Sequence, residues 1–343
     1  MHITANMINR IYSRSLITII AIFILTSCND TSSTRIPDQI ADTISAKEEE
    51  LPKSIDPASI RIEKELLYDK YTLEDTYPYK DTTRSFQWDK IRKALAFVDS
   101  IHNEPSSWAV LQNYKNMNGQ APLVRNYKRN AYTHIADSLG VERYQSVPLY
   151  YPSDSVTAEC YGRDGWLVRY IEKQGTFDKI ATVDIQGEWL VPQKYIKQLS
   201  DTTIFNNVIF IDTSNQNIAT VERTDTAWLV RSMNPATTGR HRPPHMQETP
   251  TGIFLIQEKK FKMLYLVDGT SDIGGFAPYA SRFTNGAYIH GVPVNAPATQ
   301  TVEYSPSLGT TPRSHMCVRN ATSHAQFVYG WAPTLATLVF VID

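Results

Sequence analysis

Beyond residue 140 the sequence consists of short apolar runs separated by turn-forming residues, and this pattern restricts the fold most. Residues 165–170 and 187–192 are apolar runs broken by Gly and Pro, which is typical of strands in a small barrel. Residues 208–212 and 218–222 flank a polar stretch and predict a hairpin. The closing run, residues 338–342, is apolar throughout and predicts a buried strand. We therefore expect a mainly β protein after residue 140.

Residues 58–140 show helical spacing of apolar side chains instead. One predicted helix follows Ser85, a residue type that caps helices, and repeats apolar side chains at Ile91, Leu95, Val98 and Ile101. A second predicted helix ends before Gly140 and has on one face Ala131, Ile135 and Leu139. The sequence therefore predicts an α-helical N-terminal region ahead of the strands.

Residues 1–28 have the pattern of an export signal. Arg10 and Arg14 precede the apolar run 16–25, which is too short to span a bilayer. The run ends in Leu-Thr-Ser-Cys, which resembles a bacterial lipobox with Cys28 as the lipidated residue. The alternatives are an ordinary signal peptide with a chance Cys, or a short membrane anchor. We expect a lipoprotein of the cell envelope that faces the periplasm and is held to a membrane by the lipid on Cys28.

Residues 29–57 are rich in Ser, Thr, Asp, Glu and Pro, and they predict a flexible tether between the lipid and the folded part. The net charge of the whole chain is −1, whereas nucleic-acid-binding proteins usually show a basic excess. We therefore expect a membrane contact through the lipid and no nucleic-acid partner. The sequence leaves the oligomeric state open.

Chemistry is indicated by three motifs that occur in order along the chain. They are residues 249–254 (TPTGIF), 288–291 (YIHG) and 314–319 (SHMCVR). A Cys attacks as the thiolate, which is scarce at neutral pH because the unperturbed thiol pKa is about 8.5. A nearby His can accept the thiol proton, and backbone N–H groups can hold the developing oxyanion. Cys317 taken alone would be only a weak signal, and the order of the three motifs makes it a specific one.

This order resembles the L,D-transpeptidase catalytic domain of the YkuD type, which shows a Thr-Pro-x-Gly-x-Phe turn, an Ile-His-Gly strand end and a Ser/Thr-His-Gly-Cys motif. The resemblance covers about two fifths of the chain and assigns residues 202–343 to a mainly β, sandwich-like catalytic domain. Residues 141–199, with their Gly-x-Trp-x-x-Pro stretch, look like a bacterial SH3-like barrel of the kind that accompanies cell-wall enzymes.

The resemblance also implies roles for individual residues. Cys317 would be the nucleophile, His290 the general base, and the Gly291 carbonyl would orient the His290 ring. His315 would support the nucleophile, and Arg319 would meet a substrate carboxylate. Further substrate contacts are expected at Ser314, Met316 and Tyr288. A catalytic Cys317 must stay a free thiol, which leaves Cys160 as a small buried hydrophobic residue.

Two departures from the family pattern bear on this assignment. Met316 stands where the family has Gly, and it would be strained if the position needs a positive φ. A stretch of 23 residues separates His290 from Ser314, longer than is usual in the family, and it contains several Pro residues. The longer stretch can serve as a lid or as the wall of an acceptor site, and the alternative is a surface decoration.

The reaction implied by the resemblance is acyl transfer on peptidoglycan stem peptides, with a Cys317 thioester and a 3–3 cross-link as product. It needs no cofactor. One alternative is an L,D-carboxypeptidase that uses water as acceptor, and another is a catalytically inactive lipoprotein that binds the cell wall. No metal site is predicted, because His241 and His245 lack further ligands at suitable spacing.

Overall fold

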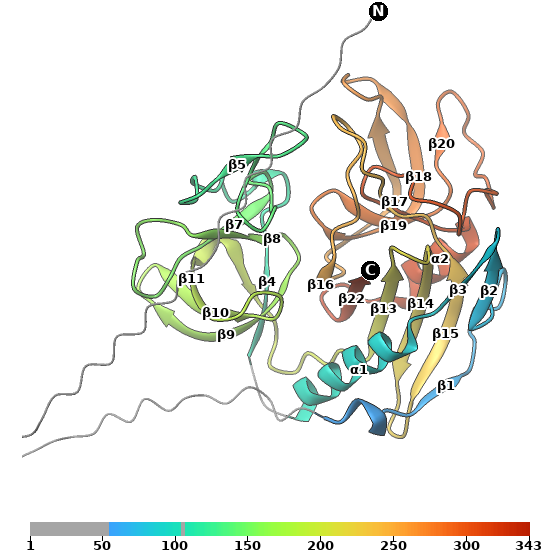
Figure 1. Cartoon of the computed structure of the whole chain (residues 1–343), viewed down its shortest axis with the longest axis horizontal. Helices are drawn as coiled ribbons and strands as arrows, with labels where there is room; N and C mark the ends of the chain where they lie inside the picture. Colours follow the sequence, from blue (N-terminus) through green and yellow to red (C-terminus); the bar gives the residue numbers. More distant parts are fainter. Residues whose placement is uncertain (1–54, 104–106) are drawn as a thin grey trace, which may run out of the picture. The chain divides into compact units, whose positions relative to one another are not determined.

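The computed structural model describes residues 55–103 and 107–343, which Figure 1 traces in colour. Cys28, the predicted signal segment 1–28 and most of the predicted tether 29–57 lie outside these residues. Among the helices of the described residues, none has the length and apolar character needed to cross a membrane.

The largest sheet has six strands in the order β1-β15-β14-β13-β22-β16. β13 pairs in parallel with β22 on one side and forms the predicted hairpin with β14 on the other. The closing run of the sequence forms β22, which is almost entirely buried. The strand bounds are β1 (Ile62–Lys64), β13 (Asn207–Asp212), β14 (Asn217–Arg223), β15 (Trp228–Pro235), β16 (Gly252–Leu255) and β22 (Thr337–Ile342).

A second sheet of the catalytic region has the order β17-β18-β19-β21, and β20 pairs with β18. Buried side chains of both sheets, among them Ile209, Val339, Ile289 and Val318, belong to one core cluster. The mainly β fold predicted for this region is therefore confirmed. The bounds are β17 (Glu258–Leu266), β18 (Ile273–Thr284), β19 (Ala287–His290), β20 (Val294–Asn295) and β21 (Val318–Arg319).

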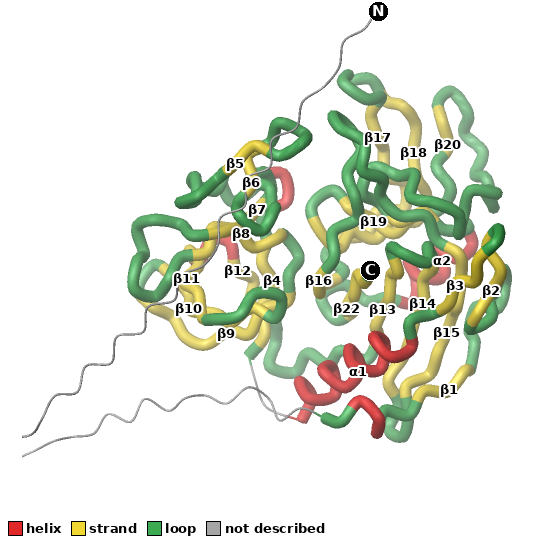
Figure 2. The backbone as a smooth tube through the Cα atoms, in the orientation of Figure 1, coloured by secondary structure: helices red, strands yellow, loops and turns green. Residues whose placement is uncertain are grey.

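The described residues contain two α-helices, shown red in Figure 2 together with short 3-10 turns. α1 (Trp88–Asn103) buries all four apolar residues of the first predicted helix against a core that includes Val208, Phe210 and Phe340 of the six-stranded sheet. α2 (Thr322–Trp331) contacts β18 and β19. α1 thus covers a sheet with its apolar side, whereas the buried side of α2 contains Thr322 and His324 as well as Ala325 and Val328. The 3-10 turns are Pro57–Ser59, Tyr114–Asn116 and Gln193–Tyr195.

The second predicted helix, through Ala131, Ile135 and Leu139, is wrong. Ala131 and Ile135 belong to a small hairpin of β5 (Lys128–Arg129) and β6 (Ile135–Ala136), and Leu139 is in the turn after it and is 56% exposed. The Asn130 side chain accepts hydrogen bonds from the backbone N–H groups at positions 132 and 134, and the Asp137 carboxylate accepts from those at 139 and 141. Because these side chains bind the local backbone, they stabilise turns at the expense of the helix.

A further antiparallel sheet has the order β11-β10-β9-β4-β12. Its strand β4 comes from the region predicted to be helical. Residues Trp108–Leu111 form a strand there because they are buried and pair with β9 on one side and β12 on the other. The SH3-like identity of this sheet stays a prediction. The remaining bounds are β2 (Thr76–Tyr79), β3 (Thr82–Ser85), β4 (Trp108–Leu111), β7 (Ser146–Leu149), β8 (Cys160–Arg163), β9 (Leu167–Gln174), β10 (Phe177–Thr182), β11 (Glu188–Pro192) and β12 (Ile196–Gln198).

The buried carboxylate of Asp164 joins this sheet to the catalytic region. It forms a 2.5 Å ion pair with Arg282 on β18 and accepts hydrogen bonds from Gln257 Nε2 at 3.0 Å and from the backbone N–H of Asn285 at 3.1 Å. The next residue, Gly165, has φ +89°, and a Cβ there would lie 2.0 Å from the Phe283 carbonyl oxygen. The chain backbones therefore meet at this turn too closely for any other residue.

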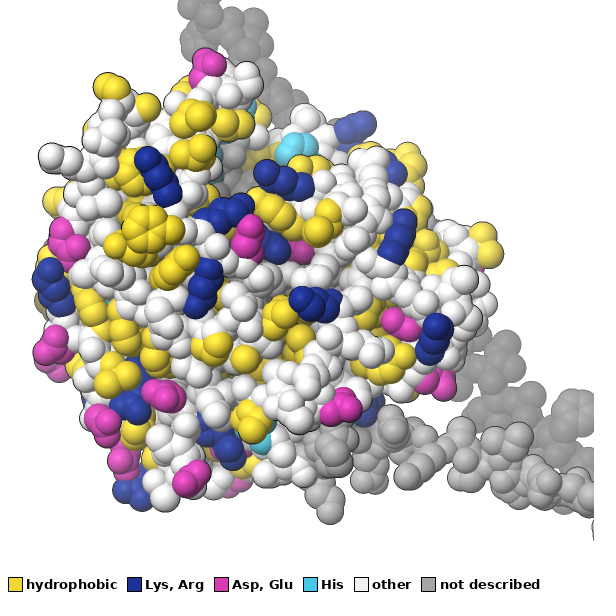
Figure 3. Space-filling view, turned by 180° about the vertical axis from the view of Figure 1, so that it is seen from behind, with side chains coloured by type: hydrophobic (Ala, Val, Ile, Leu, Met, Phe, Trp, Pro, Cys, Tyr) yellow, Lys and Arg dark blue, Asp and Glu magenta, His cyan; other side chains and the backbone are white. Residues whose placement is uncertain are grey.

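The face drawn in Figure 3 shows Lys and Arg side chains dispersed among acidic and hydrophobic ones. Charge of mixed sign over a face gives no extended positive field. This part of the surface thus agrees with the near-zero net charge of the sequence.

We expect Asp164→Ala to lower the free energy of unfolding by about 3–5 kcal/mol, because it removes the buried partner of Arg282 and leaves only Glu258 at 3.4 Å. Urea denaturation measures this change. The matched control is Glu188→Ala, which removes the exposed partner of Lys179 at 2.5 Å and should cost less than about 1 kcal/mol. Equal losses in the two variants would contradict the buried-pair interpretation.

Candidate active site

Parallel pairing of β19 with β21 brings two of the sequence motifs together. His290 is opposite Arg319, and Ile289 is opposite Val318. Cys317 immediately precedes β21, so its side chain enters the structure beside the end of β19. The hydrogen bond from the Asn320 N–H to the His290 carbonyl, 2.9 Å long, fixes this register.

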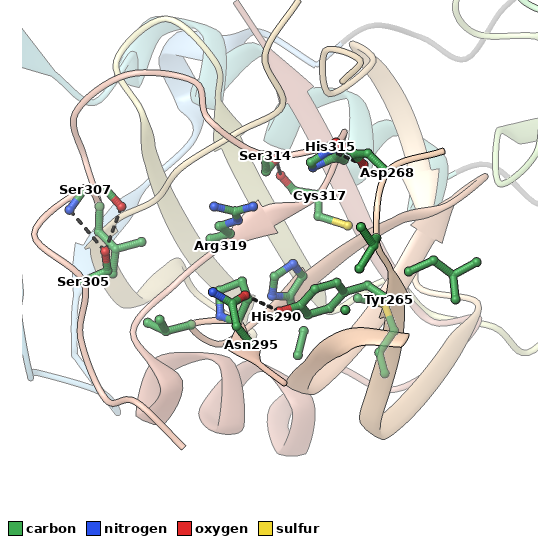
Figure 4. A pocket seen from close by; sticks show the side chains of 18 residues that line it. Tyr265, Asp268, His290, Asn295, Ser305, Ser307, Ser314, His315, Cys317 and Arg319 are labelled. Atoms are coloured by element: carbon green, nitrogen blue, oxygen red, sulfur yellow. Dashed lines mark hydrogen bonds and ion pairs between the residues drawn. The ribbon is translucent and has the colours of Figure 1, made fainter. Parts of the chain in front are cut away.

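Cys317, His290, His315, Ser314 and Arg319 all line one cavity of about 760 Å³ (Figure 4). β17 and the turn after it form one wall of this cavity, and the long stretch after His290 forms another. The wall residues include Met263, Tyr265, Leu266, Asp268, Asn295, Ser305, Ser307 and Leu308. The long stretch therefore contributes to the cavity, as expected of a lid or an acceptor wall.

The Cys317 thiol is a free, protonated group. The residue is 9% exposed, and its Sγ donates a hydrogen bond to the Gly286 carbonyl at 3.5 Å. Burial raises the pKa of Cys317 to about 11, although the Tyr288 backbone N–H and the positive charge of Arg319 act in the opposite direction. Cys160 is also a free buried thiol, and burial raises its pKa to about 12. Of the two described Cys residues, Cys317 lines the cavity and Cys160 does not.

His290 is neutral and carries its proton on Nδ1. The residue is 3% exposed, and burial lowers its pKa to about 4. Nδ1 lies 2.6 Å from the Gly291 carbonyl oxygen, which can only accept, so Nδ1 is the donor and the Nε2 lone pair stays available as a base. The described residues show no hydrogen bond between Cys317 and His290, and the thiol has to turn from Gly286 before its proton can pass.

Met316 has φ +76°, so the residue before the thiol does need the left-handed conformation that Gly supplies in the family. Several hydrogen bonds hold this strained turn. Thr249 Oγ1 donates to the Met316 carbonyl at 2.7 Å and accepts from the Gly239 N–H at 2.8 Å. Ser314 Oγ donates to the Cys317 carbonyl. The first sequence motif therefore supports the third one.

The Met316 side chain does not line the main cavity but a smaller one of about 270 Å³, together with His245, Gln247 and Gly286. His315 lines both cavities. Its Nε2 lies 3.0 Å from the Asp268 carboxylate in the turn between β17 and β18. This contact joins the turn to the loop of Cys317.

Arg319 carries a guanidinium without a protein partner. Within residues 55–103 and 107–343 no carboxylate lies within ion-pair distance, and its Nε is buried without a hydrogen bond. Burial lowers its pKa, and the neighbouring Cys317 and Tyr265 act against this shift. A buried, unpaired guanidinium at the cavity is suited to a carboxylate ligand.

Tyr288 lies beside Cys317 but not in the cavity lining. Its hydroxyl is 3.2 Å from each of three polar atoms, Tyr114 Oη, Lys260 Nζ and Glu258 Oε2. The structure therefore does not bring the Tyr288 side chain together with the other predicted substrate contacts.

Several residues that line the cavity lie outside the three sequence motifs and were not predicted from them. Tyr265 on β17 donates to Asn295 Oδ1 at 2.6 Å across the cavity wall. The stretch after His290 is anchored from the N-terminal region, because Lys70 pairs with Glu303 at 3.0 Å and the rings of Tyr71 and Tyr304 are 4.5 Å apart. These contacts join residues far apart in sequence that carry no local motif.

Of the described residues, no three His, Cys, Asp or Glu side chains are grouped so as to hold a metal ion. His241, considered as a ligand from the sequence, pairs with Glu248 at 2.5 Å and contacts the Tyr132 hydroxyl at 3.1 Å. It therefore belongs to a contact between the residue 240–248 loop and the hairpin of β5 and β6.

Residues 206–341 match the family model of the L,D-transpeptidase catalytic domain, YkuD. This part of the chain is an L,D-transpeptidase catalytic domain. The match includes all three motifs and the paired strands β19 and β21. No curated protein matches the sequence.

Solved structures show weaker similarity. An L,D-transpeptidase from Mycobacterium tuberculosis H37Rv is 16% identical, with 53% of this chain and 92% of that chain covered and a TM-score of 0.33. One from Mycobacterium smegmatis is 14% identical, with coverages of 57% and 77% and a TM-score of 0.32. A fused Zn-dependent amidase/peptidase/peptidoglycan-binding domain-containing protein from Clostridium acetobutylicum is 19% identical, and the match spans 40% of this chain and about half (51%) of that one at a TM-score of 0.29. These TM-scores add no weight to the family match.

Strain at Met316 predicts a difference between substitutions. Met316→Gly should change the free energy of unfolding by less than about 1 kcal/mol, because relief of strain offsets the lost burial of the side chain. Met316→Val should cost about 2 kcal/mol more, since a β-branched residue fits the left-handed region poorly. Urea denaturation measures both. Met263→Val in the extended strand β17 is the control, and a loss as large as that of Met316→Val would contradict the prediction.

The protonation states of the L,D-transpeptidase site predict how its thiol reacts with iodoacetamide. Because the pKa of Cys317 is raised to about 11, the rate of alkylation should rise about tenfold per pH unit through neutral pH. Peptide mapping of the alkylated chain identifies the thiol, with Cys317→Ala as control. A rate that is already constant near neutral pH would show instead a thiolate paired with a protonated His290.

Proposed function

We propose that this protein is a peptidoglycan L,D-transpeptidase that forms 3–3 cross-links through a thioester on Cys317. One observation carries the proposal. Within a domain of this family, a buried thiol, a neutral His with a free Nε2 and an unpaired guanidinium line the same cavity. These are a nucleophile, a base and a carboxylate receptor, which acyl transfer on a peptide with a free carboxylate requires.

In the proposed reaction, Arg319 binds the terminal carboxylate of a stem tetrapeptide. Cys317 Sγ attacks the carbonyl carbon of the residue before the terminal D-Ala while His290 Nε2 takes the thiol proton. The backbone N–H groups of Met316 and Cys317 donate no hydrogen bond within the described residues, so they are available to the oxyanion. The C–N bond then breaks, D-Ala leaves as the amine with the proton from His290, and the thioester remains.

An amine of a second stem resolves the thioester in the proposed cycle. The amine nitrogen attacks the thioester carbonyl, His290 accepts its proton, and the Cys317 thiol is restored as the C–S bond breaks. A new amide bond joins the two stems. Lipidation at Cys28 and a tether over residues 29–57 would hold this reaction at a membrane of the cell envelope, on its periplasmic side.

Two other functions fit the same domain. With water in place of the amine, the enzyme is an L,D-carboxypeptidase. Without turnover it is a lipoprotein that binds the cell wall. The placement of Cys317, His290 and Arg319 in one cavity favours a catalytic role over pure binding.

The first test is intact-mass spectrometry of the full-length chain mixed with a carbapenem. An L,D-transpeptidase 17% identical to this chain was solved in complex with imipenem. We expect a single covalent adduct that is absent in Cys317→Ala and forms at least about tenfold more slowly in His290→Ala, because the base is lost. No adduct on folded protein would overturn the enzymatic proposal and favour the wall-binding one.

Product analysis with purified stem tetrapeptides separates the two enzymatic functions. Cross-linked dimers indicate transfer to an amine, and tripeptides without dimers indicate hydrolysis. Arg319→Gln should raise the KM for the tetrapeptide while the thiol still reacts with iodoacetamide, because it removes the carboxylate receptor and leaves the nucleophile. An unchanged KM in this variant would contradict the role assigned to Arg319.

A further inference from the structure

A second cavity, of about 670 Å³, is separate from the catalytic one and shares no lining residue with it. Its walls come from the end of β8 and from the loop between β10 and β11 on one side, and from edge strand β16 and the end of β22 on the other. Apolar side chains make up much of the lining. Among its polar residues, Lys90 pairs with Asp343, Gln186 and Thr251 are uncharged, and three others stand out. The apolar residues include Leu139, Val141, Ile185, Ile253, Phe340 and Ile342.

The first polar residue is Arg163, whose guanidinium has no partner. Among the described residues no carboxylate lies within ion-pair distance of the guanidinium and none forms a hydrogen bond to it. Burial lowers the pKa of Arg163, and the more distant carboxylates of Asp137, Glu142 and Asp184 offset only part of this shift. Arg231 and Arg282 differ from it, since Arg231 pairs with Glu65 and Glu222, and Arg282 pairs with Asp164 and Glu258. A partly desolvated cation without a partner is costly, and an anionic ligand would offset that cost.

The second is Trp166, which is 4% exposed and whose indole N–H has no hydrogen-bond acceptor. A Cβ on Gly252 would lie 3.2 Å from this Nε1 and 3.3 Å from the carboxyl oxygen Oδ2 of Asp184, the third polar residue. Gly252 therefore keeps open a space in which a donor and an acceptor stand close together. Asp184 itself accepts the backbone N–H of Ile253, and burial raises its pKa to about 6.

The C-terminal end of a peptide offers a partner to each of these three groups. The guanidinium pairs with the terminal carboxylate in a two-point contact, the indole donates to a carbonyl, and the carboxyl accepts an amide N–H. The apolar residues then surround side chains of small or medium size. A fatty acid would leave the indole N–H and Asp184 unpaired, and a phosphate ion offers no amide N–H to the Asp184 carboxyl.

We propose that this cavity is a second binding site, specific for the C-terminal end of a peptide with a free carboxylate held by Arg163. Binding here involves no covalent step and does not depend on the reaction at Cys317. In a chain that acts on a peptide-bearing polymer, such a site holds one peptide while another occupies the catalytic cavity.

The test uses the full-length chain with fluorine-labelled tryptophan and two probes, N-acetyl-alanyl-leucine and its C-terminal amide. The fluorine signal of Trp166, assigned by its loss in Trp166→Phe, should shift and saturate with the carboxylate peptide. The amide should bind at least about tenfold more weakly, because it cannot form the charged two-point contact.

Substitutions at the cavity arginines Arg163 and Arg319 locate the binding. Arg163→Gln should abolish the Trp166 shift, and Arg163→Lys should weaken it, because Lys keeps the charge but not the two-point contact. Arg319→Gln in the catalytic cavity is the matched control and should leave the shift unchanged. If Arg163→Gln does not fold, Arg163→Lys decides the test alone.

Three results would overturn the proposal. The first is equal affinity for the carboxylate peptide and its amide. The second is binding that is lost in Arg319→Gln but stays at full strength in Arg163→Lys. The third is no shift of the Trp166 signal at a saturating concentration of the peptide. Acylation of Cys317 by a carbapenem is unaffected by each of these results. Failure of this site is therefore distinguishable from failure of the proposed enzymatic function.

Discussion

The carboxylate of Asp164 joins the sheet that contains β9 and β10 to the hairpin of β18 and β19. It pairs with Arg282 and accepts the backbone N–H of Asn285 in the hairpin turn. The next residue of that turn is Gly286, whose carbonyl accepts the Cys317 thiol. A buried carboxylate that lost these partners would be strongly destabilising, so the turn has little freedom. The position of the Cys317 thiol thus depends on a residue in the turn that leads into β9.

The resting site combines a protonated thiol with a neutral imidazole, and burial is the common cause. Desolvation disfavours both the thiolate of Cys317 and the imidazolium of His290, so the two residues do not form an ion pair in the unliganded site. In the proposed reaction the proton moves to His290 when the Cys317 thiol attacks. The strained turn at Met316 is held by Thr249 and Ser314, and it presents backbone N–H groups without folding partners.

The sequence was informative where chemistry resides in local motifs. Cys317, His290 and Arg319 meet because strand ends β19 and β21 pair directly, and short motifs fix strand ends. It misled over residues 131–139, where Asn130 and Asp137 bind the backbone and form turns despite helical spacing. It could not show that Asp268 meets His315, or that Lys70 meets Glu303 across 233 positions, because these contacts depend on how distant strands twist and pack.

The contact between Lys70 and Glu303 bears on the choice between amine and water. Glu303 also accepts from Ser323, and Arg84 donates to the Gly309 carbonyl at 2.5 Å, so the N-terminal region holds both ends of the wall that carries Ser305, Ser307 and Leu308. Contacts at both ends hold this wall in place beside Cys317. In the proposed reaction such a wall would limit the access of water to the thioester, and its hydroxyls would bind the backbone of a second stem, which supports the proposed transfer over hydrolysis. The long stretch after His290 and the region before α1 would then act as one unit in selecting the acceptor.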